Sequence, residues 1–313
     1  MKIWTAISGY LGISDENVVD IVERAPTFYR RYLVPKNRGG YREIYHPAKE
    51  TKAVQAAAIY LLQREDLVLD CVRGYVRGIR SPLVKNASIH AKSLFLLKLD
   101  FTNFFPSINP DDFRMVCADK LRLHGKRLGG DDLDFLCKLF FVFNRRLGWF
   151  LGIGAPSSPF ISNWVMYNID LDISSACAET GCKYTRYADD LCFSADSKKL
   201  LLATEEKIRE VVAACSHPRL AFNDSKRTLA SKWSRRRVTG LTITPLGEVK
   251  VPRDMKRYVR ALLHKYKLKT ISNKEKSSLA GYLAFLNDCE PEYFNNLALK
   301  YGSGTIYRAL KKR

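Results

Sequence analysis

Three aspartates of this sequence stand where short predicted strands end, and their carboxylates are candidates for a shared metal site. A short apolar segment leads into Asp100, and Asp189 and Asp190 lie between two further segments of strand-like composition. This spacing predicts a buried strand that ends at Asp100 and a hairpin with the Asp-Asp pair at its tip. In an antiparallel sheet the two strands could lie side by side, which would bring the three carboxylates to one point.

Carboxylates gathered from separate strands are what two-metal phosphoryl transfer requires. Two divalent cations about 3.5–4 Å apart activate the attacking hydroxyl and stabilise the leaving oxygen, and magnesium prefers carboxylate oxygens. An isolated Asp-Asp pair is more often a solvated turn. Asp111-Asp112 and Asp131-Asp132 are predicted to be such pairs near helix starts, where anions suit the helix dipole. The flanking strands distinguish Asp189-Asp190 from them.

The charge balance favours a polyanionic partner. The 313 residues include 52 Lys and Arg against 32 Asp and Glu, a net charge of +20. Nucleic acid is the commonest partner of such an excess, although a merely basic protein would show the same balance. The eight cysteines lack zinc-ligand spacing and are expected to be reduced thiols. No apolar run is long enough to span a membrane, so the expected location is the cytoplasm, with no membrane partner.

The rest of the pattern predicts a mixed α/β body followed by a basic helical module. Ser14 is expected to cap a helix ending near residue 23, and Asn109 with Pro110 to begin another. The segment 248–313 holds 15 Lys and Arg against 6 Asp and Glu, a net charge of +9 (15 − 6). The other expected elements are a turn at 37–40, a strand at 41–45, helices at 48–64, 159–178 (begun by Ser157-Ser158-Pro159) and 203–215, extended segments up to 251, and three helices from 253 onward.

Five segments resemble, in order, the sequence motifs of reverse transcriptases. Tyr187-Ala188-Asp189-Asp190 resembles the Tyr-X-Asp-Asp signature, and 99–105 (Leu-Asp-Phe-Thr-Asn-Phe-Phe) resembles the first aspartate motif. Segment 154–159 (Gly-Ala-Pro-Ser-Ser-Pro) resembles the turn and helix start between them, 41–47 the fingers strand, and 222–226 (Phe-Asn-Asp-Ser-Lys) the lysine motif. The resemblance covers about residues 28–250.

Two more segments are similar to elements of bacterial retron reverse transcriptases. Asn86-Ala87-Ser88-Ile89-His90 is similar to their Asn-Ala-X-X-His element, and Val238-Thr239-Gly240-Leu241 to their Val-Thr-Gly element. One position departs from the family pattern. The family usually places Pro-Gln before the Gly-Ala-Pro run, where this chain has Gly152 and Ile153. The amide of that glutamine is expected to contact nucleotide or template, and Ile153 has no amide to make this contact.

The resemblance implies an α+β, right-hand polymerase fold. Fingers and palm are expected in 1–250, with the fingers roughly at 1–95 and 125–160, interleaved with a palm of antiparallel sheet plus helices. A basic, RNA-binding helical thumb is expected in 251–313.

The resemblance also implies roles at the metal site. Asp100 and Asp189 are expected to bind metal directly, with Asp190 as a supporting carboxylate and Phe101 included in the metal site. The expected cofactor is two Mg²⁺ ions, with Mn²⁺ able to substitute. Lys226 is expected to be the general acid that protonates pyrophosphate, and a plain phosphate contact is the alternative.

A second set of residues is expected to hold the incoming dNTP. Arg42 should contact the triphosphate, because a guanidinium matches phosphate oxygens bidentately, and Lys36 should assist; a surface salt bridge is the alternative for Arg42. Phe105 resembles the steric gate that excludes a 2′-hydroxyl. A core phenylalanine is the alternative, and the pattern alone does not separate Phe105 from Phe104. Gly154 and Ala155 would let the backbone approach nucleotide or template closely.

Contacts to RNA are expected in three places along the chain. Asn86 and His90 could orient RNA, and a structural hydrogen-bonded pair is an equal alternative. The turn at 238–240 resembles a primer-gripping hairpin with a retron-specific RNA contact, and the helices after it would lie along the duplex. The expected RNA or primer contacts are Asn86, His90, Arg237, Val238, Thr239, Gly240, Arg253, Lys256, Arg257 and Arg260.

The expected function is that of a retron reverse transcriptase. By resemblance, such an enzyme copies part of a cognate structured noncoding RNA from dNTPs. It starts from a guanosine 2′-hydroxyl, makes branched RNA–DNA, and works with a separate effector protein in anti-phage defence. A small reverse transcriptase from a group II intron or a diversity-generating element is one alternative. A non-catalytic RNA-binding protein on a polymerase fold is another, and the presence of all three aspartates argues against it.

Overall fold

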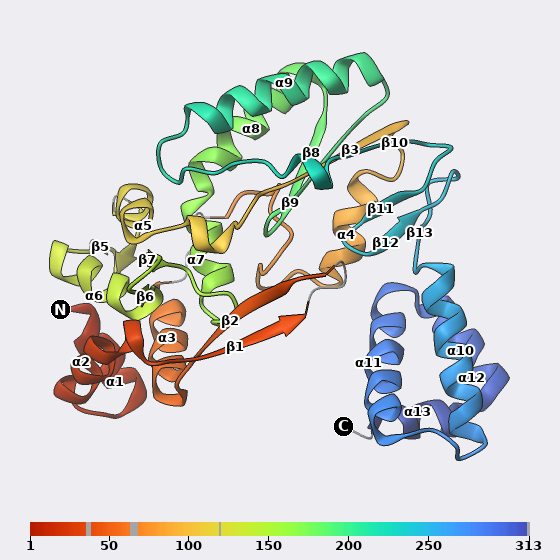
Figure 1. Ribbon diagram of the computed structural model, residues 1–313, viewed down its shortest axis with the longest axis horizontal. Coiled ribbons are helices and arrows are strands. Elements are labelled where there is room, and N and C mark those ends of the chain that lie inside the picture. Colours follow the sequence, from red (N-terminus) through yellow and green to blue (C-terminus); the bar gives the residue numbers. More distant parts are fainter. Residues whose placement is uncertain (36–38, 63–67, 119, 312–313) are drawn as a thin grey trace. The chain divides into compact units, whose positions relative to one another are not determined.

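The computed structural model describes residues 1–35, 39–62, 68–118 and 120–311 (Figure 1). The chain divides into two compact units. Unit 1 comprises 1–77, 98–191 and 199–227, and unit 2 comprises 78–97, 192–198 and 228–313. Within the described ranges, no helix combines the length and the apolar composition that a membrane crossing needs.

A four-stranded sheet contains the strands that lead to and from the three aspartates. Its order is β10 (Thr228–Ser231), β3 (Phe95–Asp100), β9 (Asp190–Ala195) and β8 (Lys183–Tyr187). The two middle strands are mostly buried, as the apolar run before Asp100 predicts. Because β3 and β9 are neighbours, the end of β3 and the start of β9 lie side by side.

Unit 1 adds helices and a long hairpin to this sheet. The hairpin pairs β1 (Tyr29–Pro35) with β2 (Tyr41–Pro47) in antiparallel register, from Tyr29 opposite Pro47 to Pro35 opposite Tyr41. Ser14 caps the second helix as predicted, accepting a hydrogen bond from the backbone N of Asn17. The other elements are α1 (Ile3–Leu11), α2 (Asp15–Arg24), α3 (Lys49–Leu62), α5 (Pro110–Cys117), β4 (Arg122–Leu123), β5 (Lys126–Arg127), α6 (Gly130–Phe140), β6 (Val142–Asn144), β7 (Gly148–Phe150), α7 (Ser158–Val165), α8 (Tyr167–Thr180) and α9 (Lys198–Ala214).

The single helix predicted at 159–178 is wrong, because the structure divides it into α7 and α8. The break falls at Met166, whose backbone has φ −75° and ψ −5°. The predicted cap is also absent, since the Ser157 side chain accepts no capping hydrogen bond. The residue at the break is methionine rather than glycine or proline, so the sequence gives no local signal that the helix ends there.

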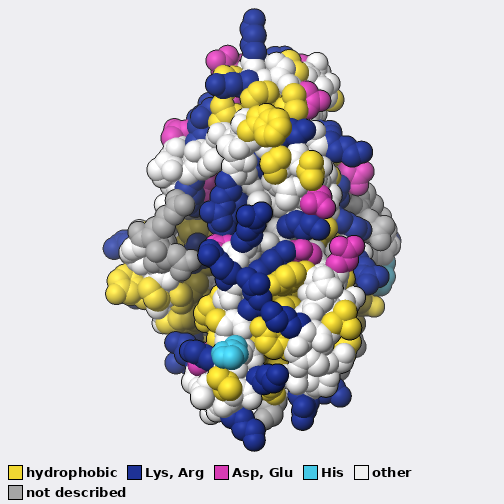
Figure 2. All heavy atoms as spheres, turned by 90° about the vertical axis from the view of Figure 1, so that its right-hand side faces the viewer, with side chains coloured by type: hydrophobic (Ala, Val, Ile, Leu, Met, Phe, Trp, Pro, Cys, Tyr) yellow, Lys and Arg dark blue, Asp and Glu magenta, His cyan; other side chains and the backbone are white. Residues whose placement is uncertain are grey.

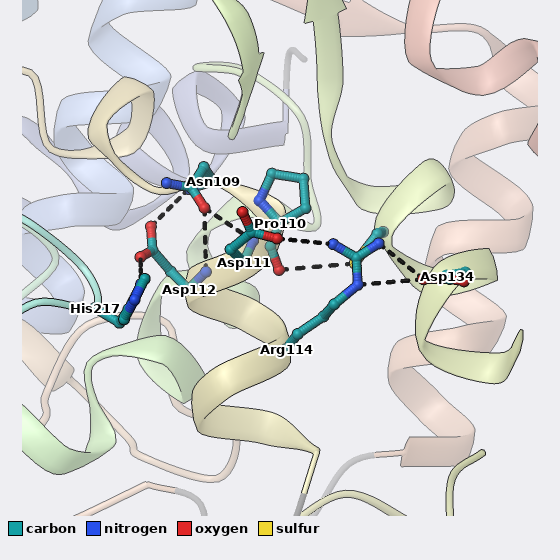
Figure 3. Close-up of polar contacts among 8 residues, drawn as sticks. Asn109, Pro110, Asp111, Asp112, Arg114, Asp134 and His217 are labelled. Carbon is teal, nitrogen blue, oxygen red and sulfur yellow. Dashed lines mark hydrogen bonds and ion pairs between the residues drawn. The ribbon is translucent and has the colours of Figure 1, made fainter. Parts of the chain in front are cut away.

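One aspartate of each acidic pair at a helix start is more buried than a solvated turn would allow. Asp112 is 1% exposed and closes a capping box with Asn109, as Figure 3 shows. Its other carboxylate oxygen lies 3.0 Å from Nδ1 of His217. Asp132 is 6% exposed and accepts hydrogen bonds from the backbone N of Gly129 and of Ile3. Their positions at helix starts are as predicted, but the prediction that all members of these pairs are solvated is wrong.

Unit 2 builds its own core from small strands and helices. It contains α4 (Pro82–Ile89), β11 (Arg236–Val238), β12 (Leu241–Ile243), β13 (Val249–Lys250), α10 (Arg253–Lys267), α11 (Asn273–Cys289), α12 (Pro291–Tyr301) and α13 (Ser303–Lys311). Apolar side chains of α4, of these strands and of all four C-terminal helices share one buried cluster. Four helices replace the three predicted, because Gly302, with φ 89°, ends α12 and lets a further short helix begin.

Candidate active site

The end of β3 and the turn between β8 and β9 are joined by backbone hydrogen bonds. The backbone N of Phe101 donates to the carbonyl of Asp189 at 3.3 Å, and that of Asn223 donates to the carbonyl of Asp100 at 2.7 Å. Ala188, at the tip of the turn, has the left-handed φ of 55°. The main chain therefore brings the predicted Asp100, Asp189 and Asp190 to one place, together with the segment that carries Lys226.

The carboxylates at this place lie in a partly dehydrated setting. Asp100 is 6% exposed, and burial raises its pKa above the ordinary value even though the nearby Lys226 ammonium acts in the opposite direction. Burial, and next the charge of Asp100, raise the pKa of Asp189. When burial and a neighbouring negative charge disfavour the ionised form of a carboxyl group, a nearby cation stabilises that form.

Lysine side chains supply the positive charge in the structure as it stands. Nζ of Lys226 lies 2.6 Å from Oδ1 of Asp100, and Nζ of Lys98 lies 3.6 Å from Oδ2 of Asp190. Within the described part of the chain, no three His, Cys, Asp or Glu side chains are gathered at metal-binding geometry. The carboxylate oxygens of Asp100 and Asp189 are nevertheless the donors that Mg²⁺ prefers. Burial and neighbouring negative charge raise the pKa values of both carboxyls, and a bound divalent cation would oppose these effects.

A buried arginine supports the turn that carries Asp189, and the sequence analysis did not single it out. Arg186 in β8 is 0% exposed. Its guanidinium donates to both carboxylate oxygens of Asp170 in α8, with Nη2 at 2.6 Å, and Nη1 donates to the carbonyl of Ala188 at 3.2 Å. Burial alone lowers the pKa of Arg186, but Asp170 raises it by more, so the guanidinium stays charged. The signal that could have revealed it was a charged residue inside a strand predicted to lead into the Asp-Asp pair.

The backbone segment around Gly154 packs against β2. The backbone N of Tyr45 donates to the carbonyl of Ile153 at 2.7 Å. Gly154 has φ +100°, and a Cβ there would lie 2.5 Å from Cγ2 of Ile44, so the close approach requires glycine. At Gly152 a Cβ would lie 2.8 Å from Cγ2 of Val142, which leaves no room for the proline that the family usually has at this position.

The residues predicted to hold the dNTP occupy different settings. Arg42 is exposed on β2, opposite Val34, and Ala155 is buried. Phe104 is 3% exposed and stacks on Phe101 with ring centroids 5.8 Å apart, whereas Phe105 is half-buried. Lys36 lies outside the described residues.

Unit 2 contains the residues predicted to contact RNA. Asn86 and His90 are 0% exposed, and Nδ1 of His90 lies 2.8 Å from the Ser194 hydroxyl. Val238 is buried, and Thr239 (φ 45°) and Gly240 (φ 85°) form the turn between β11 and β12.

The cations of this set differ in accessibility. Arg253, Arg257 and Arg260 are exposed on α10, whereas Lys256 makes a 2.6 Å ion pair with Glu290 in which its side chain is 16% exposed. Arg237, 42% exposed, lies 3.4 Å from Asp254.

Comparison with known proteins finds reverse transcriptases. Residues 34–243 match the family model described as reverse transcriptase (RNA-dependent DNA polymerase). The retron Ec83 reverse transcriptase of Escherichia coli is 36% identical, covering 92% of this chain and 91% of that protein. The retron Ec73 reverse transcriptase of the same species is 27% identical, covering 96% of this chain and 95% of that protein. The solved structure of apo telomerase from Candida tropicalis covers 92% of this chain and 61% of its own, with a TM-score of 0.50 and 12% identity, a likeness of fold alone.

Proposed function

This chain belongs to the reverse transcriptase family and, within it, to the retron enzymes. It is therefore an RNA-directed DNA polymerase with the right-hand fold. On that premise we propose that Asp100, Asp189 and Asp190 form its metal centre. The observation that carries the proposal is the convergence of these carboxylates at one backbone junction. The raised pKa values of Asp100 and Asp189 support it, because a cation between them would stabilise both charges.

Reverse transcriptases generally use divalent metals, and we propose two Mg²⁺ ions here, with Mn²⁺ able to substitute. The bound ions would lower the pKa of the primer hydroxyl and stabilise charge on the leaving oxygen. Asp100 and Asp189 would hold them, with Asp190 and the backbone at Phe101 completing the site. Lys226 would turn from Asp100 to the phosphates, where it serves either as proton donor to pyrophosphate or as a phosphate contact.

The neighbouring residues would position the nucleotide. Arg42 is exposed on the strand that packs against Gly154, so its guanidinium can approach a triphosphate held there. Lys36 would assist. Gly154 and Ala155 would let the nucleotide or template come close to the backbone. Phe105, half-buried beside the buried Phe104, would fill the space that a ribose 2′-hydroxyl needs.

The assignment of regions follows the same premise. Residues 1–250 would form fingers and palm, with the fingers roughly at 1–95 and 125–160, and 251–313 would form the thumb. The four helices α10–α13 fall within the proposed thumb, and exposed Arg253, Arg257 and Arg260 supply cations for duplex phosphates. We assign RNA contacts also to Arg237 and the 238–240 turn, whereas Asn86 and His90, both 0% exposed, would orient RNA only through the residues packed around them.

The proposed substrate is a cognate structured noncoding RNA. DNA synthesis would start at the 2′-hydroxyl of a guanosine in that RNA and leave a branched RNA–DNA product. A separate effector protein and a role in anti-phage defence complete the proposal. Names of the relatives support the retron assignment, and the order of the motifs along the chain supports the chemistry.

The test is a change of one atom in the RNA. The RNA that copurifies with the protein is sequenced, and the priming guanosine is mapped from the branch in the product. That RNA is then remade with 2′-deoxyguanosine at this position and incubated with the protein, dNTPs and Mg²⁺. We expect no DNA joined to this RNA, and full extension of a separate DNA primer on an RNA template by the same preparation. DNA joined to the 2′-deoxy RNA would contradict branched priming and leave the polymerase assignment intact.

A further inference from the structure

Trp233 is the most exposed aromatic side chain in the described part of the chain. It is 83% exposed, whereas Tyr41, the next among the aromatics, is 66% exposed. Trp233 lies in unit 2, in the turn between β10 and β11. Because an exposed indole lacks the favourable free energy of burial, a binding partner that covers the ring would gain that free energy.

Hydrogen bonds fix the turn on the N-terminal side of the indole. The backbone N of Ser234 donates to the carbonyl of Ser231 at 3.0 Å, and the backbone N of Ser231 donates to the Ser234 hydroxyl oxygen at 2.8 Å. The backbone N of Lys232 donates to the carbonyl of Leu94 at 2.6 Å. Trp233 is therefore presented by an ordered turn.

A buried arginine fixes the chain on the C-terminal side. Arg236 is 0% exposed, and its guanidinium donates to the carbonyl of Ser93 at 2.5 Å and to that of Thr244 at 2.8 Å. With both flanks bonded, the backbone that carries the indole is held in place. The low conformational freedom of the turn reduces the entropic cost when a flat partner stacks on the ring.

Cationic residues flank Trp233 along the chain. Nζ of Lys232 lies 5.8 Å from the ring centroid. Arg235 is 63% exposed and Arg237 is 42% exposed, and their nearest approaches to Asp254 are 3.9 Å and 3.4 Å. Exposed ion pairs of this kind contribute little, so both guanidinium groups can exchange Asp254 for phosphate.

The charge of the chain is concentrated in the same unit. Unit 2 holds 23 Lys and Arg against 7 Asp and Glu, a net charge of +16 (23 − 7) out of the total of +20. Figure 2 shows a face of the molecule on which many Lys and Arg side chains gather. A flat indole among cations matches a base and its phosphates, whereas a protein-docking tryptophan is more often surrounded by further apolar side chains.

We propose that Trp233 is a stacking platform for an unpaired base of the noncoding RNA, with Lys232, Arg235 and Arg237 binding the phosphates beside it. The inference rests on the proposed function, which supplies the RNA partner. Stacking does not require a particular base, because every base offers a flat face. A continuous duplex hides those faces, so the bound nucleotide belongs to a loop, a bulge or an end.

The probe is the RNA that copurifies with the wild-type chain, sequenced and transcribed in vitro. Trp233→Ala should weaken its binding about tenfold, the effect expected for one stacked base, and Trp233→Phe should stay within about threefold of wild type because a ring remains. The slope of log K against log[salt] should not change in Trp233→Ala. In Arg235→Ala/Arg237→Ala it should flatten, because two phosphate-binding cations are removed. Chemical probing of the bound RNA should find one nucleotide protected by wild type and Trp233→Phe but not by Trp233→Ala.

The control is Leu299→Ala, which removes an apolar side chain that is 82% exposed on α12 of the same unit; it should bind as wild type does. Extension of a DNA primer on an unrelated RNA template should be normal in Trp233→Ala, Trp233→Phe and Leu299→Ala. Wild-type affinity in Trp233→Ala would overturn the inference, as would loss of a copurifying protein with RNA binding unchanged, which would make the turn a protein-docking site. A wild-type chain that binds no RNA would instead refute the proposed RNA partnership itself.

Discussion

Phe104 and Phe105 are adjacent in the sequence but differ in what their rings contact. Phe104 continues an aromatic stack in which Phe101 also lies 5.0 Å from Phe222, centroid to centroid. Phe105 meets Phe104 edge to face at 5.2 Å and keeps part of its surface free. At the residue scale, this difference favours Phe105 over Phe104 as the sugar-facing side chain.

We expect Phe105→Ala to admit ribonucleotides, because removing the ring opens space for a 2′-hydroxyl. The measurement is the ratio of rNTP to dNTP incorporation on an RNA template. Phe105→Tyr is the matched control and should exclude rNTPs as wild type does. An unchanged ratio in Phe105→Ala would show that the sugar is read elsewhere.

The sequence predicted the carboxylates of the site better than it predicted their surroundings. Asp100 and the Asp189-Asp190 pair were identifiable because strand-like segments flank them. The pairing of Arg186 with Asp170 joins residues 16 positions apart on different elements, and no local pattern encodes it. The buried Asp112 likewise contacts a residue distant in sequence, His217.

At the element scale, the turn between β8 and β9 depends on support from a buried ion pair. Asp170 binds the guanidinium of Arg186 and also accepts a hydrogen bond from the Tyr184 hydroxyl at 2.8 Å. Asn163 of α7 accepts from the same guanidinium at 3.1 Å and donates to the carbonyl of Gly74 at 2.9 Å. Two helices therefore hold the strand that ends in the turn of the proposed metal centre.

Arg186→Lys should lower kcat by about tenfold to a hundredfold, the effect expected when reacting groups shift by about 1 Å. Lysine keeps the charge opposite Asp170 but cannot reach Asp170 and the Ala188 carbonyl at once. The KM for dNTP should change little, because Arg186 is buried away from solvent.

Arg114→Lys is the control for this variant. Figure 3 shows Arg114 bonded to Asp111 and Asp134, a bridging arginine on α5 that does not contact the turn. It should leave kcat unchanged. A wild-type kcat in Arg186→Lys would mean that the buried pair serves stability alone.

Helix beginnings were predictable where local signals exist, and helix interruptions were not. Ser14 and Asn109 cap the helices that they were expected to cap. The break at Met166 has no local signal, and it appears only in the packed structure. The fourth C-terminal helix did have a local signal, because Gly302 is a residue type that commonly ends a helix.

Across the whole molecule, the charge excess and the proposed metal centre fall on different parts of the chain. Unit 1 contains the aspartates and holds 29 Lys and Arg against 25 Asp and Glu, a net charge of +4 (29 − 25). Unit 2 carries the remaining +16. Composition alone revealed the total charge, but the division into units depends on contacts between distant segments. The right-hand fold itself followed from the family motifs rather than from composition.

Neutralising Arg253, Arg257 and Arg260 to Gln should weaken binding to all RNAs alike and flatten the salt dependence. The slope of log K against log[salt] should fall by about 0.7–0.9 for each phosphate that is no longer neutralised by an arginine. Lys256 is left intact because its pair with Glu290 is structural. The comparison is between the cognate RNA and an unrelated RNA of equal length. Selective weakening toward the cognate RNA would assign sequence recognition, rather than charge, to these arginines.

We propose that the three aspartates hold the metals for DNA synthesis, and the variant Asp189→Asn tests this assignment most directly. The measurement is extension of a DNA primer on an RNA template with dNTPs and Mg²⁺, alongside the affinity of the same preparation for RNA. Asparagine keeps the shape of the side chain but removes the charge that would bind metal. We predict extension below about one per cent of wild type, with RNA affinity unchanged. Extension above that level by a pure, folded Asp189→Asn protein would contradict the metal assignment.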